Sequence, residues 1–424
     1  MSIIVMKFGG TSVANIERIE HAAGKVAREV ARGHQCAVVV SAMSGVTNQL
    51  VGWVNELHAD YDAQEYDAVV ATGEQVTAGL MAIALQKRGL KSRSWQGWQA
   101  GIISSSAHGK ARIHAIDGGP LQNALGAGEI PVITGFQGVT GQGRITTLGR
   151  GGSDTSAVAL AAALEAERCD IYTDVDGVYT TDPRIVPEAR KLPFISYEEM
   201  MELASVGAKV LQIRSVELAM KRNVKLQVLS SLDDTIGSDY PGTMLVKEED
   251  MLESQVISGV TLSRDEAKIT LRGIKDEPGI AASAVRPLAE AGINLDMIVQ
   301  NVTMDGKYTD MTFTVPQSEL PKALKAIEGG GVKAQEIITD DKVAKVSLVG
   351  IGMRAHPDIA LRMFETLAAE KINIGVIGTS EIKISVLIDQ SRGEDAVRAL
   401  HRAFKLDQVE KAPQILKNRA EEGL

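Results

Sequence analysis

Short apolar runs alternate with stretches of helical spacing over about the first 235 residues. Apolar runs of strand length occur at 3–6, 36–40, 130–134, 170–173 and 225–230. Between them, apolar residues recur at helical spacing from about 16–30, 48–59, 76–89, 155–164, 198–205 and 209–222. Such alternation predicts an α/β domain (residues 1–235) with a largely parallel sheet and helices on both faces. Ligands of such sheets bind at the C-terminal ends of the strands.

The pattern changes after this domain. The segment from Asp233 to Glu253 is polar and turn-rich, and we expect residues 236–262 to form a linker. Beyond it, residues 273–298 match residues 352–377 without a gap, with nine of 26 positions identical. Each copy has the pattern strand, loop, helix, strand. We therefore expect two tandem α+β modules, at 263–340 and 341–424.

Composition narrows the function. Apolar residues make up 44% of the chain and charged residues 23%, with a net charge of −9 and no Lys/Arg run that resembles a nucleic-acid footprint. No apolar stretch approaches the ~20 residues of a membrane helix. Cys36 and Cys169 lie in apolar runs, which favours buried free thiols in a reducing cytoplasm. We find no Cys/His cluster with metal-ligand spacing and expect no protein-held metal.

The first strand leads into Lys-Phe-Gly-Gly-Thr-Ser at 7–12, just before a helix. Glycines let backbone N–H groups approach an anion and the lysine adds a point charge, as in a phosphate cradle. The sequence lacks the Walker pattern. A plain tight turn between strand and helix explains these six residues equally well.

A second glycine-rich loop, 141–154, ends Leu-Gly-Arg-Gly-Gly-Ser-Asp before another helix. Ser153 or Asp154 is suited to cap that helix, and Arg150 offers a planar fork for a carboxylate or phosphate. The alternative is a mobile loop with an ordinary N-cap.

A third loop, 174–184, is rich in carboxylates but does not fit the spacing of an EF-hand. It suits a loop against a nucleotide base or ribose, or simply a solvated acidic loop. Lys209 stands at the expected start of a helix, where lysines are less common than at C-termini. Residues 350–355 satisfy G-x-G-x-x-G/A, but they lie within the repeat, whose first copy lacks that fingerprint, so we do not expect a dinucleotide site.

Taken together, these motifs resemble the aspartate kinase family. The resemblance rests on residues 7–12, Ser-Ala-Met-Ser-Gly-Val-Thr at 41–47, Thr-Gly-Glu at 72–74, 148–154 and 173–184, with Asp-Glu-Pro-Gly at 276–279 in the first repeat. It implies an amino-acid-kinase fold followed by two ACT domains, which are ferredoxin-like α+β modules. The implied reaction is ATP-dependent phosphorylation of the β-carboxylate of L-aspartate to 4-phospho-L-aspartate, the first step towards lysine, threonine and methionine. The chain resembles the monofunctional form.

The resemblance also implies roles for single residues. Lys7 holds the transferring phosphoryl group, Asp154 orients Lys7, and Arg150 grips a carboxylate of aspartate while Glu74 takes its ammonium. The other residues of the aspartate cleft are Ser41, Thr47, Gly151, Gly152 and Ser153. The nucleotide, as ATP with Mg²⁺, is bound by Lys7, Gly9, Gly10, Thr173, Asp174, Tyr179, Arg184 and Lys209, with Gly9 and Gly10 supplying backbone donors.

Feedback by lysine, threonine or both is implied for the ACT modules. The expected effector-binding residues are Asp276, Gly279, Ala281, Asn294, Leu295, Asp296, Gln300, Asn373 and Ile374. Asp358 stands where the first copy has Gly279, which puts a second effector loop in doubt. ACT modules pair side by side, which implies a homo-oligomer, and Met251 is a possible start for a separate regulatory subunit. The alternatives are another amino-acid kinase of the same fold and a catalytically silent amino-acid sensor.

Overall fold

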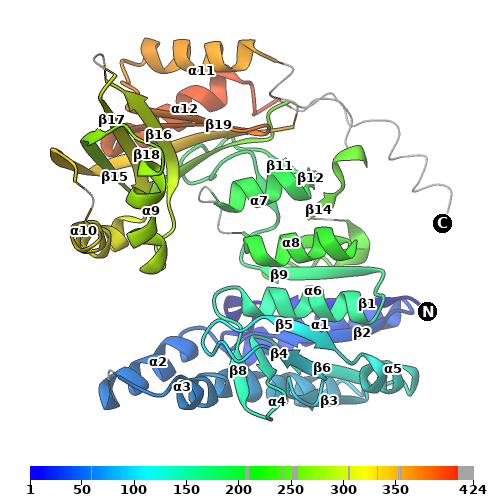
Figure 1. Ribbon diagram of the computed structural model, residues 1–424. Helices are drawn as coiled ribbons and strands as arrows, with labels where there is room; N and C mark the ends of the chain where they lie inside the picture. The colour runs from blue at the N-terminus through cyan, green and yellow to red at the C-terminus, as the bar shows by residue number, and fades with distance from the viewer. Residues whose placement is uncertain are drawn as a thin grey trace. The chain divides into compact units, whose positions relative to one another are not determined.

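The computed structural model describes residues 1–58, 60–205, 210–240, 242–250, 256–303, 306–331, 333–351, 353 and 356–408 (Figure 1). The chain divides into two compact units. The first comprises residues 1–178, 191–204 and 209–251, and the second comprises residues 179–190, 205–208 and 252–424. Each unit is described by itself below.

An eight-stranded sheet forms the centre of the first unit, in the order β12-β14-β13-β9-β1-β2-β6-β3. Its described neighbours pair in parallel except β13 and β14. The registers align Phe8 with both Val40 and Tyr172, so β1, β2 and β9 end at the same edge. The strands are β1 (Ile3–Phe8), β2 (Gln35–Val40), β3 (Ser92–Trp95), β6 (Ile130–Thr134), β9 (Arg168–Thr173), β12 (Phe194–Ser196), β13 (Leu226–Ser230) and β14 (Thr243–Val246).

Helices cover both faces of this sheet, as the sequence predicts. On one face, α1 and α4 pack on β1 and β2, with Ile4, Met6 and Phe8 in the shared core. On β1, Lys7 alternates with these residues, and α6 packs against β1 and β9. The helices are α1 (Ile16–Ala31), α2 (Val46–Leu57), α3 (Ala63–Val70), α4 (Thr72–Lys87), α5 (Gly119–Gly126), α6 (Gly152–Ala163), α7 (Tyr197–Ser205) and α8 (Ile213–Arg222).

A small second sheet lies beside the main one, in the order β5-β4-β7-β8. The sequence analysis did not predict it, because its strands have only three or four residues, too few for a period-two pattern to stand out. They are β4 (Ile102–Ser104), β5 (Ile113–Ile116), β7 (Gln137–Val139) and β8 (Ile145–Thr147). Strand β8 falls inside the loop expected at 141–154.

The positions expected for some elements of this unit differ from the structure. Glu74 lies in the first turn of α4, not in a loop before the helix. Part of the expected linker forms β14, which pairs with β12 and β13 and so belongs to the sheet. Helix α8 begins at Ile213 and not near Lys209, and Lys209 itself lies outside the described residues.

One helical stretch, Ala63–Lys87, is long and apolar enough to cross a membrane by length and composition, contrary to our reading of the sequence. It comprises α3 and α4, and 56% of its apolar window is buried. Met81 and Leu85 of α4 pack in the core beneath the sheet. Core helices of globular domains pass the same test of length and composition. Cys36 and Cys169 are buried free thiols, as predicted.

The second unit contains one six-stranded antiparallel sheet, in the order β16-β17-β15-β18-β20-β19 (Figure 1). It carries the two repeats. Its strands are β15 (Gly259–Lys275), β16 (Asp296–Val302), β17 (Tyr308–Val315), β18 (Glu336–Val349), β19 (Val376–Thr379) and β20 (Lys383–Asp389). Its helices are α9 (Ile280–Glu290), α10 (Leu320–Gly329), α11 (Asp358–Ala369) and α12 (Gly393–Ala403).

The two modules share their longest strands. The second half of β15 pairs with β17 and with the first half of β18, around the core of the first module. The first half of β15, with Val260 and Leu262, pairs with the second half of β18 and packs in the core of the second module. The first strand of the second module therefore precedes the first module. The expected boundaries at 263 and 341 fall inside strands.

Residues 179–190 belong to the second unit, although the sequence analysis assigned them to the kinase domain. Val186 packs in the core of the second module, and the Thr180 carbonyl accepts a hydrogen bond from the Val260 N–H. The Thr180 hydroxyl lies 2.9 Å from His401 Nε2 in a buried contact. This segment is built into the second module by apolar packing and hydrogen bonds.

Candidate active site

A buried ion pair marks the C-terminal edge of the main sheet. Lys7 Nζ on β1 lies 2.5 Å from Asp154 Oδ1 in the first turn of α6, and both residues are less than 10% exposed. The helix N-terminus favours a carboxylate there. The N-cap is Gly151 at φ 68°, so neither Ser153 nor Asp154 caps the helix. Because a left-handed glycine turns the chain into α6, Asp154 is free to face Lys7.

The Gly9–Gly10 turn after Lys7 allows close approach of the backbone. A Cβ on Gly9 would lie 3.5 Å from Lys7 Nζ, and one on Gly10 would lie 3.0 Å from the Ala42 carbonyl oxygen. The Gly9 N–H donates to the Tyr172 carbonyl at 3.1 Å, so it is not the free donor that we expected. Ser12 Oγ donates to the same carbonyl at 3.2 Å. No motif in the sequence singles out Tyr172, whose ring also stacks on Phe8.

Glu74 brings a buried carboxylate to this edge. Its Oε1 accepts the Ala42 N–H at 3.0 Å, while Oε2 is buried with no hydrogen-bond partner among the described residues. Burial raises the pKa of Glu74 to about 7. A buried carboxylate oxygen without a partner is costly, and a ligand ammonium would satisfy it.

Arg150 projects from the loop between β8 and α6. It is exposed and has no ion pair or hydrogen bond within the part of the chain that the structure describes. Gly149 at φ 76° and Gly151 at φ 68° flank it, and both are held in the left-handed region. Gly152 packs against Phe136, and a Cβ on Gly135 would lie 2.7 Å from Ser153. The loop is thus tightly packed, while the guanidinium is left for a ligand.

Contacts link these groups into one edge. Lys7 pairs with Asp154, the Phe8 carbonyl accepts the Ser41 N–H at 3.1 Å, and the next residue, Ala42, donates to Glu74. Thr47 is half-buried in the first turn of α2. Two cations and two carboxylates at one sheet edge can bind a zwitterionic amino acid and offset the charge of a phosphate.

The residues expected to bind the nucleotide divide between the two units. Thr173 and Asp174 follow β9 in the first unit, where the Thr173 hydroxyl lies 3.2 Å from Asp174 Oδ1. Tyr179 and Arg184 belong to the second unit, and the exposed Arg184 guanidinium pairs with Asp182 at 2.7 Å. Their binding of the nucleotide stays a prediction, as does that of Lys209, which lies outside the described residues.

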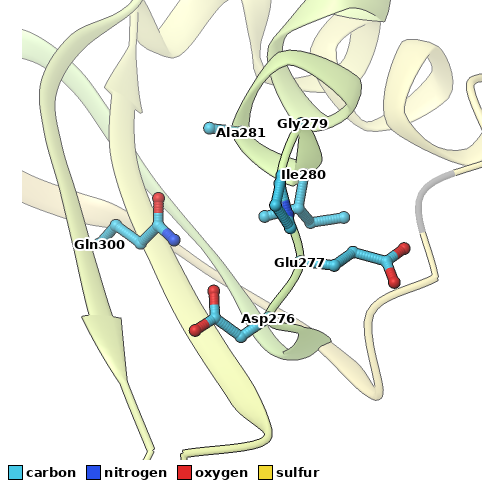
Figure 2. A pocket seen from close by; sticks show the side chains of 7 residues that line it. Asp276, Glu277, Gly279, Ile280, Ala281 and Gln300 are labelled. Atoms are coloured by element: carbon cyan, nitrogen blue, oxygen red, sulfur yellow. The ribbon is translucent and has the colours of Figure 1, made fainter.

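A pocket of about 400 Å³ lies in the first module of the second unit (Figure 2). In Figure 2, Asp276 from the loop after β15 and Gln300 from β16 turn their side chains toward one another. Four of the expected effector residues line the pocket. Three residues of the same loop and helix start, which the sequence analysis did not name as effector-binding, line it too: Glu277, Pro278 and Ile280. The four are Asp276, Gly279, Ala281 and Gln300.

The other expected effector residues do not line this pocket. Asp296 pairs with Lys345 Nζ at 2.7 Å, and Leu295 and Ile374 pack against the cores of their modules. Asn294 and Asn373 are exposed in the loops that precede β16 and β19. No three His, Cys, Asp or Glu residues among those described come together as metal ligands.

Comparison with known proteins agrees with this architecture. Residues 2–230 match the amino acid kinase family, and residues 269–329 and 346–404 each match an ACT domain. The chain is 53% identical to the aspartokinase of Pseudomonas aeruginosa over 411 residues, which cover 96% of this chain and 98% of that protein.

Two solved structures of Escherichia coli aspartokinase III are similar to this protein, and each match covers 95% of this chain and 99% of the E. coli chain. The complex with aspartate and ADP, in the R state, is 25% identical with a TM-score of 0.74. The complex with lysine and aspartate, in the T state, is 26% identical with a TM-score of 0.73. With a kinase domain, two ACT domains and this similarity along nearly its whole length, the chain belongs to the aspartate kinase family.

Proposed function

We propose that this aspartate kinase phosphorylates the β-carboxylate of L-aspartate at the site built around Lys7, with MgATP as the donor. The observation that carries the proposal is the buried Lys7–Asp154 pair at the edge where β1, β2 and β9 end. Asp154 holds the lysine side chain at a fixed place, so that its ammonium is ready to stabilise charge on the transferring phosphoryl group.

The reaction requires alignment of its two substrates more than acid–base catalysis. A carboxylate is already a nucleophile, so no general base or covalent intermediate is required. The difficulty is to bring two anions together, which calls for cations and backbone N–H groups. Mg²⁺ enters with ATP: in such sites it is bound mainly by phosphate oxygens and one or two carboxylates, and a dedicated protein cage is not needed.

Glu74 and Arg150 are proposed to recognise the amino acid. The ammonium of aspartate would satisfy Glu74 Oε2, which has no partner in the described structure, and would favour the ionised form of Glu74. The Arg150 guanidinium would bind a carboxylate of aspartate with its two parallel N–H donors. Ser41, Thr47 and residues 151–153 would line the same cleft.

The pocket in the first ACT module is proposed as the effector site. Asp276 and Glu277 give it two carboxylates, which suit a cationic amino acid, so lysine is the expected inhibitor there. The E. coli aspartokinase III structure with lysine supports this choice. The second module has Pro357 in a right-handed conformation where α11 begins, in contrast to Gly279 at φ 94°. We therefore assign the lysine site to the first module, and threonine, alone or with lysine, is the other effector that the inhibition assay tests.

We place the enzyme in the cytoplasm, at the first step towards lysine, threonine and methionine, as a homo-oligomer that pairs through its ACT modules. We also propose Met251 as the start of a separate regulatory subunit. Met251 lies outside the described residues.

One assay tests the proposed activity. The enzyme is incubated with MgATP and either aspartate or glutamate, and the acyl phosphate is trapped with hydroxylamine. Turnover with aspartate supports the proposal. Turnover with glutamate alone would indicate another amino-acid kinase, and none with either would indicate a silent sensor. Lysine, threonine and both together are then added to identify the inhibitor.

A further inference from the structure

Asp67 is a fully buried carboxylate that no role above uses. It lies on α3 with 0% exposure, and its oxygens accept several hydrogen bonds. The Thr147 hydroxyl donates at 2.5 Å, the Gly109 N–H lies 3.1 Å from both oxygens, and His108 Nδ1 lies 2.7 Å away. The carboxylate therefore joins α3 to β8 and to the loop at 108–109.

Thr147 stands three residues before Arg150, and the chain between them is held at each step. The Thr147 carbonyl accepts the Ala111 N–H at 2.9 Å, and the Leu148 N–H donates to the Phe136 carbonyl at 2.8 Å. Arg214 donates to the Leu148 carbonyl at 2.7 Å. Arg150, by contrast, has no partner among the described residues, so its position is set by the backbone that leads to it.

The other side of Asp67 leads to Glu74. Helix α3 ends at Val70 and α4 begins at Thr72, so only Ala71 separates the helix of Asp67 from that of Glu74. The Ala71 carbonyl accepts a hydrogen bond from Gln137 Nε2 at 3.1 Å. The start of α4 is thus fixed to the same small sheet as the loop that carries Arg150.

We propose that Asp67 is a positioning residue that fixes Arg150 relative to Glu74 through the Thr147 hydroxyl, and so sets the affinity for aspartate. This inference rests on the proposed roles of Arg150 and Glu74. The Asp67–Thr147 bond spans the two segments that carry them. Without it, the backbone hydrogen bonds of residues 147 and 148 remain, but the Thr147 hydroxyl no longer ties the end of β8 to α3. Misplacement of a binding group by about 1 Å can cost on the order of 10²-fold.

Thr147→Val tests this bond with little change in shape, and Thr147→Ser restores the hydroxyl. We expect Thr147→Val to raise the KM for aspartate about 10-fold or more and to leave the KM for ATP within about twofold. Thr147→Ser is expected to restore the aspartate KM. Asp67→Asn should act in the same direction as Thr147→Val. The matched control is Glu65→Gln, on the same helix, whose carboxylate pairs with Arg144 at the surface.

A double-mutant cycle separates positioning from general stability. If Asp67 and Thr147 act through Arg150, Thr147→Val should add less than about twofold to the aspartate KM in an Arg150→Ala background. Additive effects, or equal changes in the KM of aspartate and ATP that follow the melting temperature, would overturn the inference. If Arg150→Ala alone leaves the aspartate KM unchanged, the proposed role of Arg150 fails as well. If Arg150→Ala raises the aspartate KM but Thr147→Val does not, the positioning role of Asp67 fails while the role of Arg150 stands.

Discussion

Lys7 Nζ and Asp154 Oδ1 lie 2.5 Å apart, with both side chains buried, where β1 meets the first turn of α6. Each charge stabilises the other, because both side chains are largely shielded from solvent. Removing one partner of a buried pair typically destabilises a protein by about 3–5 kcal/mol, because a charge is left uncompensated. Variants at either position therefore need a measurement of folding beside the measurement of activity.

Asp154→Asn is expected to reduce turnover strongly while the KM for aspartate changes little. The asparagine keeps the shape of the side chain but no longer holds the Lys7 ammonium by charge. Loss of one such contribution to the transition state is typically on the order of 10²–10³-fold. The hydroxylamine assay measures this, with near-ultraviolet circular dichroism as the control for folding. An unchanged turnover in the folded variant would contradict a positioning role for Asp154.

We expect kcat/KM for aspartate to depend on pH near neutrality because of Glu74. Burial raises its pKa to about 7 in the free enzyme, and only the ionised carboxylate attracts an ammonium strongly. We therefore expect kcat/KM for aspartate to fall as the pH drops below about 7. The check is a pH profile of wild type and Glu74→Gln, whose lower kcat/KM should lack this titration. An identical titration in the variant would assign it to another group.

The raised pKa of Glu74 should also make the free energy of unfolding depend on pH. Unfolded, Glu74 releases its proton near its ordinary value of 4.5, whereas folded it holds the proton up to about 7. The contribution of Glu74 to the free energy of unfolding is therefore fully present below about pH 4.5. It is lost as the pH rises to about 7, and the free energy of unfolding falls by about 3 kcal/mol over this range. Subtracting the free energies of unfolding of Glu74→Gln from those of wild type isolates this from other buried acids, such as Asp170. A difference that does not vary with pH would show that Glu74 is not perturbed.

Asp276→Asn is expected to weaken inhibition by lysine about 10-fold or more while activity without effector stays unchanged. The carboxylate lines the pocket of the first module, and charge-assisted bonds to an ammonium are the strong contacts that such a pocket offers. Inhibition curves for lysine measure it. Asp340→Asn is the matched control, because Asp340 is a surface carboxylate of the same unit that accepts the Lys342 N–H. Equal lysine inhibition in wild type and Asp276→Asn would show that lysine does not bind through Asp276 in this pocket.

The sequence was sufficient to predict the alternating fold, the repeat and the loops of Lys7 and Arg150, because those features are local. Glycines next to a lysine or an arginine indicate a loop from the local sequence alone, without knowledge of the rest of the fold. Asp67 escaped notice because its partners, at 108, 109 and 147, meet it only in three dimensions. In the sequence it is one of two acids, with Glu65, in a short helical segment.

Boundaries were harder to predict for a related reason. Strand β14 has four residues in a polar stretch, and nothing local indicates that it completes the main sheet. Strand β15 serves both modules, so a cut drawn from the repeat necessarily misses its first half. The Asp358 departure was visible in the sequence, and the structure gives it a local reason, since α11 begins without a left-handed glycine.

The most direct test of the whole account is the turnover of Lys7→Met, an uncharged replacement of similar length. It is measured by hydroxylamine trapping with saturating MgATP and aspartate, beside Lys7→Met/Asp154→Asn, which removes the orphaned charge and so protects the fold. We predict that both variants fold and that turnover falls at least about 10²–10³-fold in each. Turnover within a few-fold of wild type in either folded variant would contradict the placing of Lys7 at the point of phosphoryl transfer.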